Sequence, residues 1–278
     1  MAEDLTPGGP DPDPARPPAG IDTSVAHPAR VYDYWLGGKD NFAADREAAE
    51  QVIAARPTIL RDIRANRAFL NRAVRYLAAE AGIRQFLDIG TGIPTSPNVH
   101  EIVQRVAPQS RVVYADNDPI VLSHARALLA SSPEGATDYV EADLRRPEEI
   151  LRRAQQTLDF TQPVAVVLVG IFHLISDDEG PYGITARLMD ATVPGSYLVV
   201  SHPASDIHAA AQAQAQKRYN ERVSTRQTLR NRAEVTRFFD GLDLVPPGVV
   251  YVHAWRPDPG DVPPADGVSA HGGVARKP

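Results

Sequence analysis

The chain has 278 residues, of which 43% are hydrophobic and 23% are charged, so it can build one sizeable α/β core. Its formal net charge of −6 argues against broad binding to the phosphate backbone of nucleic acids. The chain contains no cysteine, which excludes disulfides, thiolate zinc sites and a cysteine nucleophile. Because it also has no long apolar run and no signal-peptide pattern, we expect a cytoplasmic protein with a small-molecule partner, and neither nucleic acid nor membrane. Composition leaves the oligomeric state open.

The two ends of the chain have the composition of disordered segments. Residues 1–20 contain six prolines together with acidic residues and glycines, and almost nothing large and apolar. Residues 257–278 are again rich in proline, glycine and alanine, so we expect a second disordered tail there. The folded part is then predicted to comprise a helical cap or lid over residues 21–84 and a nucleotide-binding domain over residues 85–256.

Within the predicted cap, two helices have clear boundaries. One is expected over Ala43–Ala55, ending before Pro57, and a longer one over residues 58–80, stopping at Gly82. The longer helix carries an apolar stripe on one face, as expected for a helix that packs against a core.

Residues 32–41 form a candidate lid, in which closely spaced aromatic residues are followed by a pair of glycines. Aromatic faces attract a cationic ligand, and the glycines would allow the polar residues after them to bend inward. The alternative is that the aromatic residues only dock the N-terminal helices onto the sheet. The lid residues that we expect near a ligand are Tyr32 (a tentative catalytic residue), Tyr34, Lys39 and Asn41.

The predicted nucleotide-binding domain begins with a strand, a glycine-rich turn and a helix. The apolar run at residues 85–87 predicts a short buried strand, and Gly90 and Gly92 mark the turn that follows it. Asn98 and Glu101 have the spacing of a capping box, which predicts the start of a helix. Glycines in such a turn let the backbone approach a ligand closely, so this unit favours a nucleotide site.

The turn departs from the dehydrogenase fingerprint, which has a third glycine where this chain has Thr95. The pattern Asp-x-Gly-x-Gly at residues 88–92 instead resembles motif I of the class I S-adenosylmethionine methyltransferases, although Pro94 stands at the usual third glycine. The resemblance implies that Asp88 faces the ammonium end of the cofactor. It also implies that Gly90, Thr91 and Gly92 pack against the cofactor. A tight turn without a ligand is the alternative.

Two further strands are predicted to end in acidic residues. The strand at residues 111–115 ends in Asp116, which lies 24 residues after Gly92, near the position of the ribose-binding acid in nucleotide-binding βαβ folds. Asp118 before Pro119 has the form of a helix cap. The strand at residues 138–142 ends in Asp143, where the methyltransferase resemblance implies a polar contact to adenine. Asn117 or Asp118 is expected to flank the adenine. Alternatively, Asp116 and Asp143 are ordinary loop residues at strand ends.

Two histidines follow the next predicted strands. A continuous apolar run at residues 164–169 predicts a strand that is buried on both faces, and His173 follows it. His202 follows a fifth strand at residues 196–200. Either histidine is a candidate general base, although a lone histidine is more often a structural residue. Residues 242–245 and 249–255 would close the sheet as an antiparallel hairpin.

Several longer motifs together resemble one family, the S-adenosylmethionine-dependent methyltransferases of high-GC bacteria that were long classed as a domain of unknown function. The resemblance covers roughly residues 21–257. It implies a Rossmann-like methyltransferase fold with a mostly parallel seven-stranded sheet, a C-terminal antiparallel hairpin and an N-terminal helical cap. The motifs are Arg30–Tyr34, Gly37–Arg46, Leu87–Gly92, Val113–Pro119 and Arg237–Gly241.

The sequence therefore predicts an S-adenosylmethionine-dependent methyltransferase that acts on an unidentified, small-molecule acceptor. The alternative is a protein that binds S-adenosylmethionine or another nucleotide for regulation or interaction and transfers nothing. A dehydrogenase is the third hypothesis.

Overall fold

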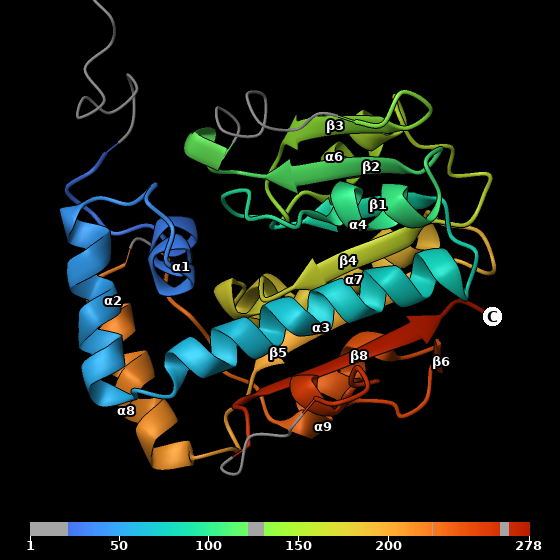
Figure 1. Cartoon of the computed structure of the whole chain (residues 1–278). Coiled ribbons are helices and arrows are strands. Elements are labelled where there is room, and N and C mark those ends of the chain that lie inside the picture. The colour runs from blue at the N-terminus through green and yellow to red at the C-terminus, as the bar shows by residue number, and fades with distance from the viewer. Residues whose placement is uncertain (1–21, 122–130, 224, 262–266) are drawn as a thin grey trace, which may run out of the picture.

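The computed structural model describes residues 22–121, 131–223, 225–261 and 267–278, so the predicted disorder of residues 1–20 lies outside the described residues. Its centre is an eight-stranded sheet with the order β3-β2-β1-β4-β5-β8-β6, in which β7 also pairs with β8 (Figure 1). Strands β1 to β5 are parallel, and β8 is antiparallel to its neighbours. The strands are β1 (Gln85–Ile89), β2 (Arg111–Asp116), β3 (Ala136–Glu141), β4 (Ala165–Val169), β5 (Tyr197–Pro203), β6 (Asp243–Leu244), β7 (Val250–Tyr251) and β8 (Ala270–Arg276).

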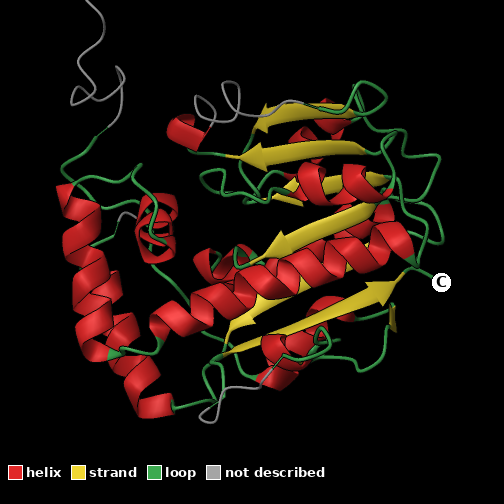
Figure 2. Cartoon of the chain, viewed as in Figure 1, coloured by secondary structure: helices red, strands yellow, loops and turns green. Residues whose placement is uncertain are grey.

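Helices cover both faces of this sheet, which gives the three layers of an α/β fold (Figure 2). Side chains of β1 alternate between the two layers: Phe86 packs with α3 and α4, while Leu87 packs with α6 and α7. The central strand β4 is buried on both faces, which explains its continuous apolar sequence. The helices are α1 (Pro28–Leu36), α2 (Ala43–Ala55), α3 (Ile59–Ala79), α4 (Val99–Val106), α6 (Pro147–Ala154), α7 (Pro181–Asp190), α8 (Ala209–Asn220) and α9 (Arg232–Thr236), with short 3₁₀ turns at η1 (Phe172–Leu174), η2 (Asp177–Glu179), η3 (Arg237–Phe239) and η4 (Val252–Ala254).

A separate apolar cluster joins α1, α2 and α8 at the end of the sheet towards which the parallel strands point (Figure 1). Trp35 of α1 packs here with Val52 of α2 and Tyr219 of α8. The cap is therefore built from the N-terminal helices and from α8, which follows β5. Helix α3 was expected to belong to the cap, but most of its buried residues pack on the sheet. No helix among the described residues is long and apolar enough to cross a membrane.

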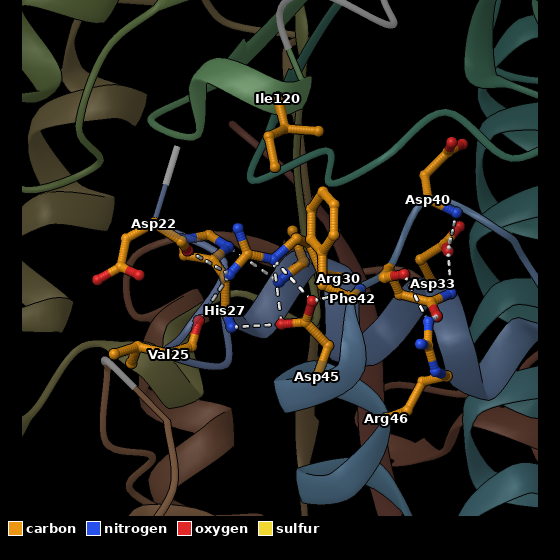
Figure 3. Close-up of polar contacts among 12 residues, drawn as sticks. Asp22, Val25, His27, Arg30, Asp33, Asp40, Phe42, Asp45, Arg46 and Ile120 are labelled. Atoms are coloured by element: carbon orange, nitrogen blue, oxygen red, sulfur yellow. Dashed lines mark hydrogen bonds and ion pairs between the residues drawn. The ribbon is translucent and has the colours of Figure 1, made fainter. Parts of the chain in front are cut away.

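A buried ion pair between Arg30 of α1 and Asp45 of α2 holds the N-terminal part of the cap together (Figure 3). The Asp45 carboxylate also accepts hydrogen bonds from the backbone N–H groups of His27 and Phe42, both at 2.8 Å. The Arg30 guanidinium donates to the carbonyl oxygens of Asp22 and Val25. One charge pair thus satisfies backbone groups before α1 and at the start of α2.

The prediction of a disordered tail over residues 257–278 is wrong, because Ala270–Arg276 form the buried strand β8. The expected hairpin between residues 242–245 and 249–255 is corrected as well, since β6 and β7 each pair with β8 and not with one another. The two glycines of β8 suggested disorder, but close packing explains both of them. A Cβ atom on Gly272 would lie 2.9 Å from Val252 and 3.0 Å from Phe69, and one on Gly273 would lie 3.1 Å from Val249.

Candidate functional site

A cavity of about 160 Å³ lies at the carboxyl ends of β1, β2 and β4, between the sheet and α1. In open α/β sheets, ligands bind at this edge of the strands. Nine of the residues predicted from the sequence line the cavity, and they come from α1 and from the ends of four strands or the loops after them. These residues are Tyr32, Asp88, Gly90, Thr91, Gly92, Asp116, Asn117, Asp143 and His173.

The glycine turn after β1 forms the floor of the cavity, and both glycines have positive φ angles, 74° at Gly90 and 63° at Gly92. Other residues adopt this conformation at a cost. A Cβ atom on Gly90 would overlap with the side chain of Ile171, whereas the corresponding space at Gly92 is open. Gly90 is therefore required by packing within the protein, and Gly92 leaves room on the cavity side of the turn.

Asp88 is buried at the end of β1, with 6% of its surface exposed. Burial raises the pKa of its carboxyl from 3.8 to about 7, while Arg67 opposes this shift and Asp116 adds to it. A carboxylate in such a position is stabilised by a positively charged ligand, which would replace the lost solvation.

Asp116, at the end of β2, accepts hydrogen bonds from the backbone N–H of Gly92 at 2.8 Å and from that of Asp118 at 3.0 Å. Burial raises the pKa of the Asp116 carboxyl, although these hydrogen bonds lower it in part. Asp118 accepts from the N–H of Ile120 at 2.9 Å, as expected of a helix cap. Its other carboxylate oxygen lies 2.9 Å from Nδ1 of His27, which connects the start of α1 to the loop after β2.

Asp143 and Asn117 occupy the more open part of the cavity. The Asp143 carboxylate accepts a hydrogen bond from the backbone N–H of Arg145 at 2.9 Å and forms an ion pair with the Arg145 guanidinium at 3.2 Å. About a third of the Asp143 side chain is exposed, so its carboxylate remains accessible to a ligand. Asn117 is exposed and lies next to Asp116 on the cavity wall.

Tyr32 and His173 line the part of the cavity below α1. The Tyr32 hydroxyl accepts a hydrogen bond from Asn66 at 3.3 Å, and Asn66 in turn accepts one from the Ser201 hydroxyl at 2.6 Å. Nδ1 of His173 is buried and has no hydrogen-bond partner among the described residues. Burial, with a smaller contribution from Arg230, lowers the pKa of His173 to about 4, so its imidazole is neutral at pH 7.

His202 does not line this cavity, which corrects the prediction that it faces an acceptor as a base. Its Nδ1 lies 2.8 Å from the carbonyl oxygen of Pro203, and its Nε2 lies 2.9 Å from Nη1 of Arg230. Because the arginine can only donate, Nε2 is the acceptor and Nδ1 carries the proton. Burial lowers the pKa of His202 far below its usual value. His202 is thus a neutral structural residue that anchors Arg230.

The other lid residues also lie outside the cavity lining. The Tyr34 hydroxyl donates to Glu50, and Lys39 is exposed. The Asn41 amide donates to the Asp33 carboxylate at 2.9 Å and to the Gly38 carbonyl oxygen at 3.0 Å.

The loop that carries Asn41 turns towards α1, not towards a ligand. Asp33 also accepts from the backbone N–H of Asp40 (Figure 3). A Cβ atom on Gly38 would overlap with the Asp33 carboxylate, which explains this glycine by packing. The structure therefore corrects the prediction that residues 37–41 bend over a ligand.

Arg67 of α3 is a cavity residue that sequence reasoning missed. Its Nη2 donates to the carbonyl oxygens of Thr95 and Pro97, and its Nε has no hydrogen-bond partner among the described residues. The positive charge of Arg67 also lowers the pKa of Asp88 and so opposes the effect of burial. No local pattern marked Arg67, because it reaches the glycine turn from a helix that precedes β1 and carries several other arginines.

Comparisons with known proteins agree on one family. Residues 14–278 match the sequence model of the S-adenosyl methyltransferases. A protein of the DUF574 family from Streptomyces avermitilis is 49% identical, with a TM-score of 0.89 over 92% of this chain and 99% of its own. A candidate methyltransferase from Thermobifida fusca is 42% identical, with a TM-score of 0.85 over 95% of this chain and 99% of its own. A search of curated proteins found no match.

Proposed function

The chain belongs to the S-adenosyl methyltransferase family, and from this premise we propose that the cavity binds S-adenosylmethionine for methyl transfer to a small molecule. One observation carries the proposal: acidic side chains at or just after the ends of three neighbouring parallel strands, Asp88, Asp116 and Asp143, line the same cavity. A nucleoside with a positively charged substituent matches these groups, because carboxylates accept from hydroxyl and amino groups and attract cations.

The residues present fit the two ends of such a cofactor. Asp88 would hold the ammonium group, since a nearby cation favours the ionised form of a buried carboxyl. Arg67, with its Nε unpaired among the described residues, would hold the carboxylate of the same amino-acid moiety. Asp116 would accept from the ribose hydroxyls, and Asp143 with Asn117 would contact the adenine.

S-adenosylmethionine, when bound, supplies a methyl group on a positively charged sulfonium. The chain's own residues would position the acceptor and exclude water, which are the main requirements of an in-line displacement. Tyr32 and His173 are the polar side chains that we assign to the acceptor side. The neutral imidazole of His173 can accept a hydrogen bond from the acceptor. The alternative of a binding protein without transferase activity gains no support from the family assignment.

Calorimetric titration with S-adenosylhomocysteine tests the assignment without knowledge of the acceptor. We expect Asp116→Ala to weaken binding about tenfold or more, because loss of a charged hydrogen-bond acceptor costs roughly 1.5–3 kcal/mol. Glu141→Ala is the matched control, since Glu141 lies beside Asp116 in the strand register, is exposed and does not line the cavity. Failure of the unmodified protein to bind, or equal affinities for the two variants, would refute the proposal.

A further inference from the structure

A second, smaller cavity of about 80 Å³ adjoins the main cavity below α1. The two cavities share wall residues, among them Tyr32, Asn66, Gly170 and His173. The remaining wall comes from α2, α3 and α8, from the end of β5, from the loop after α8 and from the start of β8. A molecule in this side cavity would lie against the side of the main cavity that we assign to methyl transfer.

The wall of the side cavity is largely apolar. Its apolar residues include Trp35, Val52, Ile59, Ile63 and Ala215. Several polar wall residues are occupied within the protein: Gln212 donates to the carbonyl oxygen of Ala204 at 2.9 Å, and Gln216 donates to that of Gln227 at 2.8 Å. An occupant would therefore gain most of its binding free energy from apolar contact.

The two charged wall residues of the side cavity compensate one another, although Nε of Arg56 and Oδ1 of Asp62 have no hydrogen-bond partner among the described residues. Arg56 and Asp62 are buried and form an ion pair at 3.0 Å. Neutral His173 adds no charge at pH 7. A charged group that entered this space would lose its hydration without gaining a free counter-ion, which is costly. A protonated amine would in addition be repelled by the cofactor's sulfonium.

His173 lines both cavities, and its buried Nδ1 has no hydrogen-bond partner among the described residues. With a pKa of about 4 it accepts a hydrogen bond but is a weak base. A hydroxyl group that is itself acidic needs little help from a base, whereas an aliphatic alcohol needs a strong one.

We propose that the side cavity binds the methyl acceptor, and that the acceptor is a compact, neutral, largely apolar molecule with a weakly acidic hydroxyl group, such as a phenol. This inference rests on the proposed function. In the transfer, the acceptor oxygen forms a bond to the methyl carbon as the carbon–sulfur bond breaks, which leaves a neutral thioether. The acceptor oxygen, once it has bonded to the methyl carbon, loses its proton to the imidazole of His173, and the proton then passes to solvent.

Four probes of matched size test the chemical class: 4-methylphenol, 4-methylbenzyl alcohol, 4-methylbenzylamine and 4-methylbenzoate. Binding to the protein saturated with S-adenosylhomocysteine is followed by the change in tryptophan fluorescence, since Trp35 lines both cavities and Trp255, the second tryptophan, lines neither. Methyl transfer is followed with labelled S-adenosylmethionine. We expect 4-methylphenol to bind at least tenfold more tightly than the amine and the benzoate, and to be methylated faster than the alcohol.

Two substitutions on α8 test the location. Ala215→Phe fills the side cavity, whereas Ala213→Phe places the same side chain at an exposed position two residues away. We expect both variants to keep their affinity for S-adenosylhomocysteine, and only Ala215→Phe to lose at least tenfold in binding of 4-methylphenol. Ile63→Trp, at a half-buried wall position of α3, repeats the test if Ala215→Phe does not fold.

The outcomes separate the two proposals. Loss of S-adenosylhomocysteine binding in the unmodified protein would overturn the proposed function and this inference with it. If S-adenosylhomocysteine binds but no probe does, if a charged probe binds as well as 4-methylphenol, or if filling the side cavity changes nothing, this inference alone is overturned.

Discussion

At the scale of single residues, Asp88 links the stability of the protein to its binding site. Burial raises the pKa of this carboxyl from 3.8 to about 7 in the folded chain. Between these two pH values the folded chain keeps a proton that the unfolded chain has released. Stability contributed by this residue therefore falls as pH rises towards 7 and is constant above it.

Asp88→Asn keeps the size of the side chain and removes its ionisation. We expect the variant to gain stability relative to the unmodified protein as pH rises from 5 to 8, by up to roughly 1.4 kcal/mol for each pH unit below 7. Urea unfolding of the ligand-free protein at pH 5, 6, 7 and 8 measures this difference. Glu141→Gln, at an exposed position of β3, should leave the pH profile unchanged.

The same substitution should weaken binding of S-adenosylhomocysteine, because the ammonium group would lose its counter-ion. A difference in unfolding free energy that does not vary with pH would contradict the role assigned to Asp88. A variant that gains stability and loses binding, as expected, would identify Asp88 as a residue where function is maintained at the expense of stability.

At the scale of elements, the join between α1 and α2 depends on the buried pair of Arg30 and Asp45. Removing one partner of such a pair leaves an uncompensated buried charge. The Asp45 carboxylate also accepts hydrogen bonds from the backbone N–H groups of His27 and Phe42. Displacement of Asp45 would therefore affect the starts of both α1 and α2. Because Tyr32 and Trp35 of α1 line the cavity, displacement of this helix should reach the ligand site.

We therefore expect Arg30→Met to destabilise the protein by about 3–5 kcal/mol and to weaken binding of S-adenosylhomocysteine. Arg64→Met, which removes an exposed arginine from α3, is the matched control and should change stability by less than about 0.5 kcal/mol. Urea unfolding and calorimetry measure the two effects. Equal stabilities of the two variants would show that the ion pair does not hold the cap.

Elements with local signals were predictable from the sequence. Helix α2 has the predicted bounds, and Asn98 and Glu101 form the expected capping box at α4. Cavity positions of Asp88 and Asp116 follow from the rule that parallel strands end at one edge of a sheet. These features depend on periodicity, caps and turns, which lie within a few residues of one another.

Features that depend on distant partners were not predictable in this way. His202 is oriented by Arg230, 28 positions further along the chain, and Asn41 is turned away from the cavity by Asp33. In the sequence, the glycines of β8 look like those of a flexible tail. Only the structure shows that other side chains lie close to where their Cβ atoms would be. Arg67 reaches the cavity from α3, which precedes β1 and its glycine-rich turn in the chain.

At the scale of the whole molecule, two neighbouring cavities lie between the sheet and the cap. The strand ends present acidic groups to the main cavity, and α1, α2 and α8 with part of α3 surround the smaller one. Since α8 follows β5, the cap around the smaller cavity is built by segments from both halves of the chain (Figure 1). This arrangement places the cap over the carboxyl ends of the parallel strands.

A crystal structure of the protein with S-adenosylhomocysteine tests the central claim most directly. We predict density above the turn at Gly90 and Gly92, with the ribose at Asp116, the ammonium group at Asp88 and the sulfur directed towards Tyr32 and His173. Density at another place, or a ligand whose ribose and ammonium groups contact neither Asp116 nor Asp88, would contradict the account.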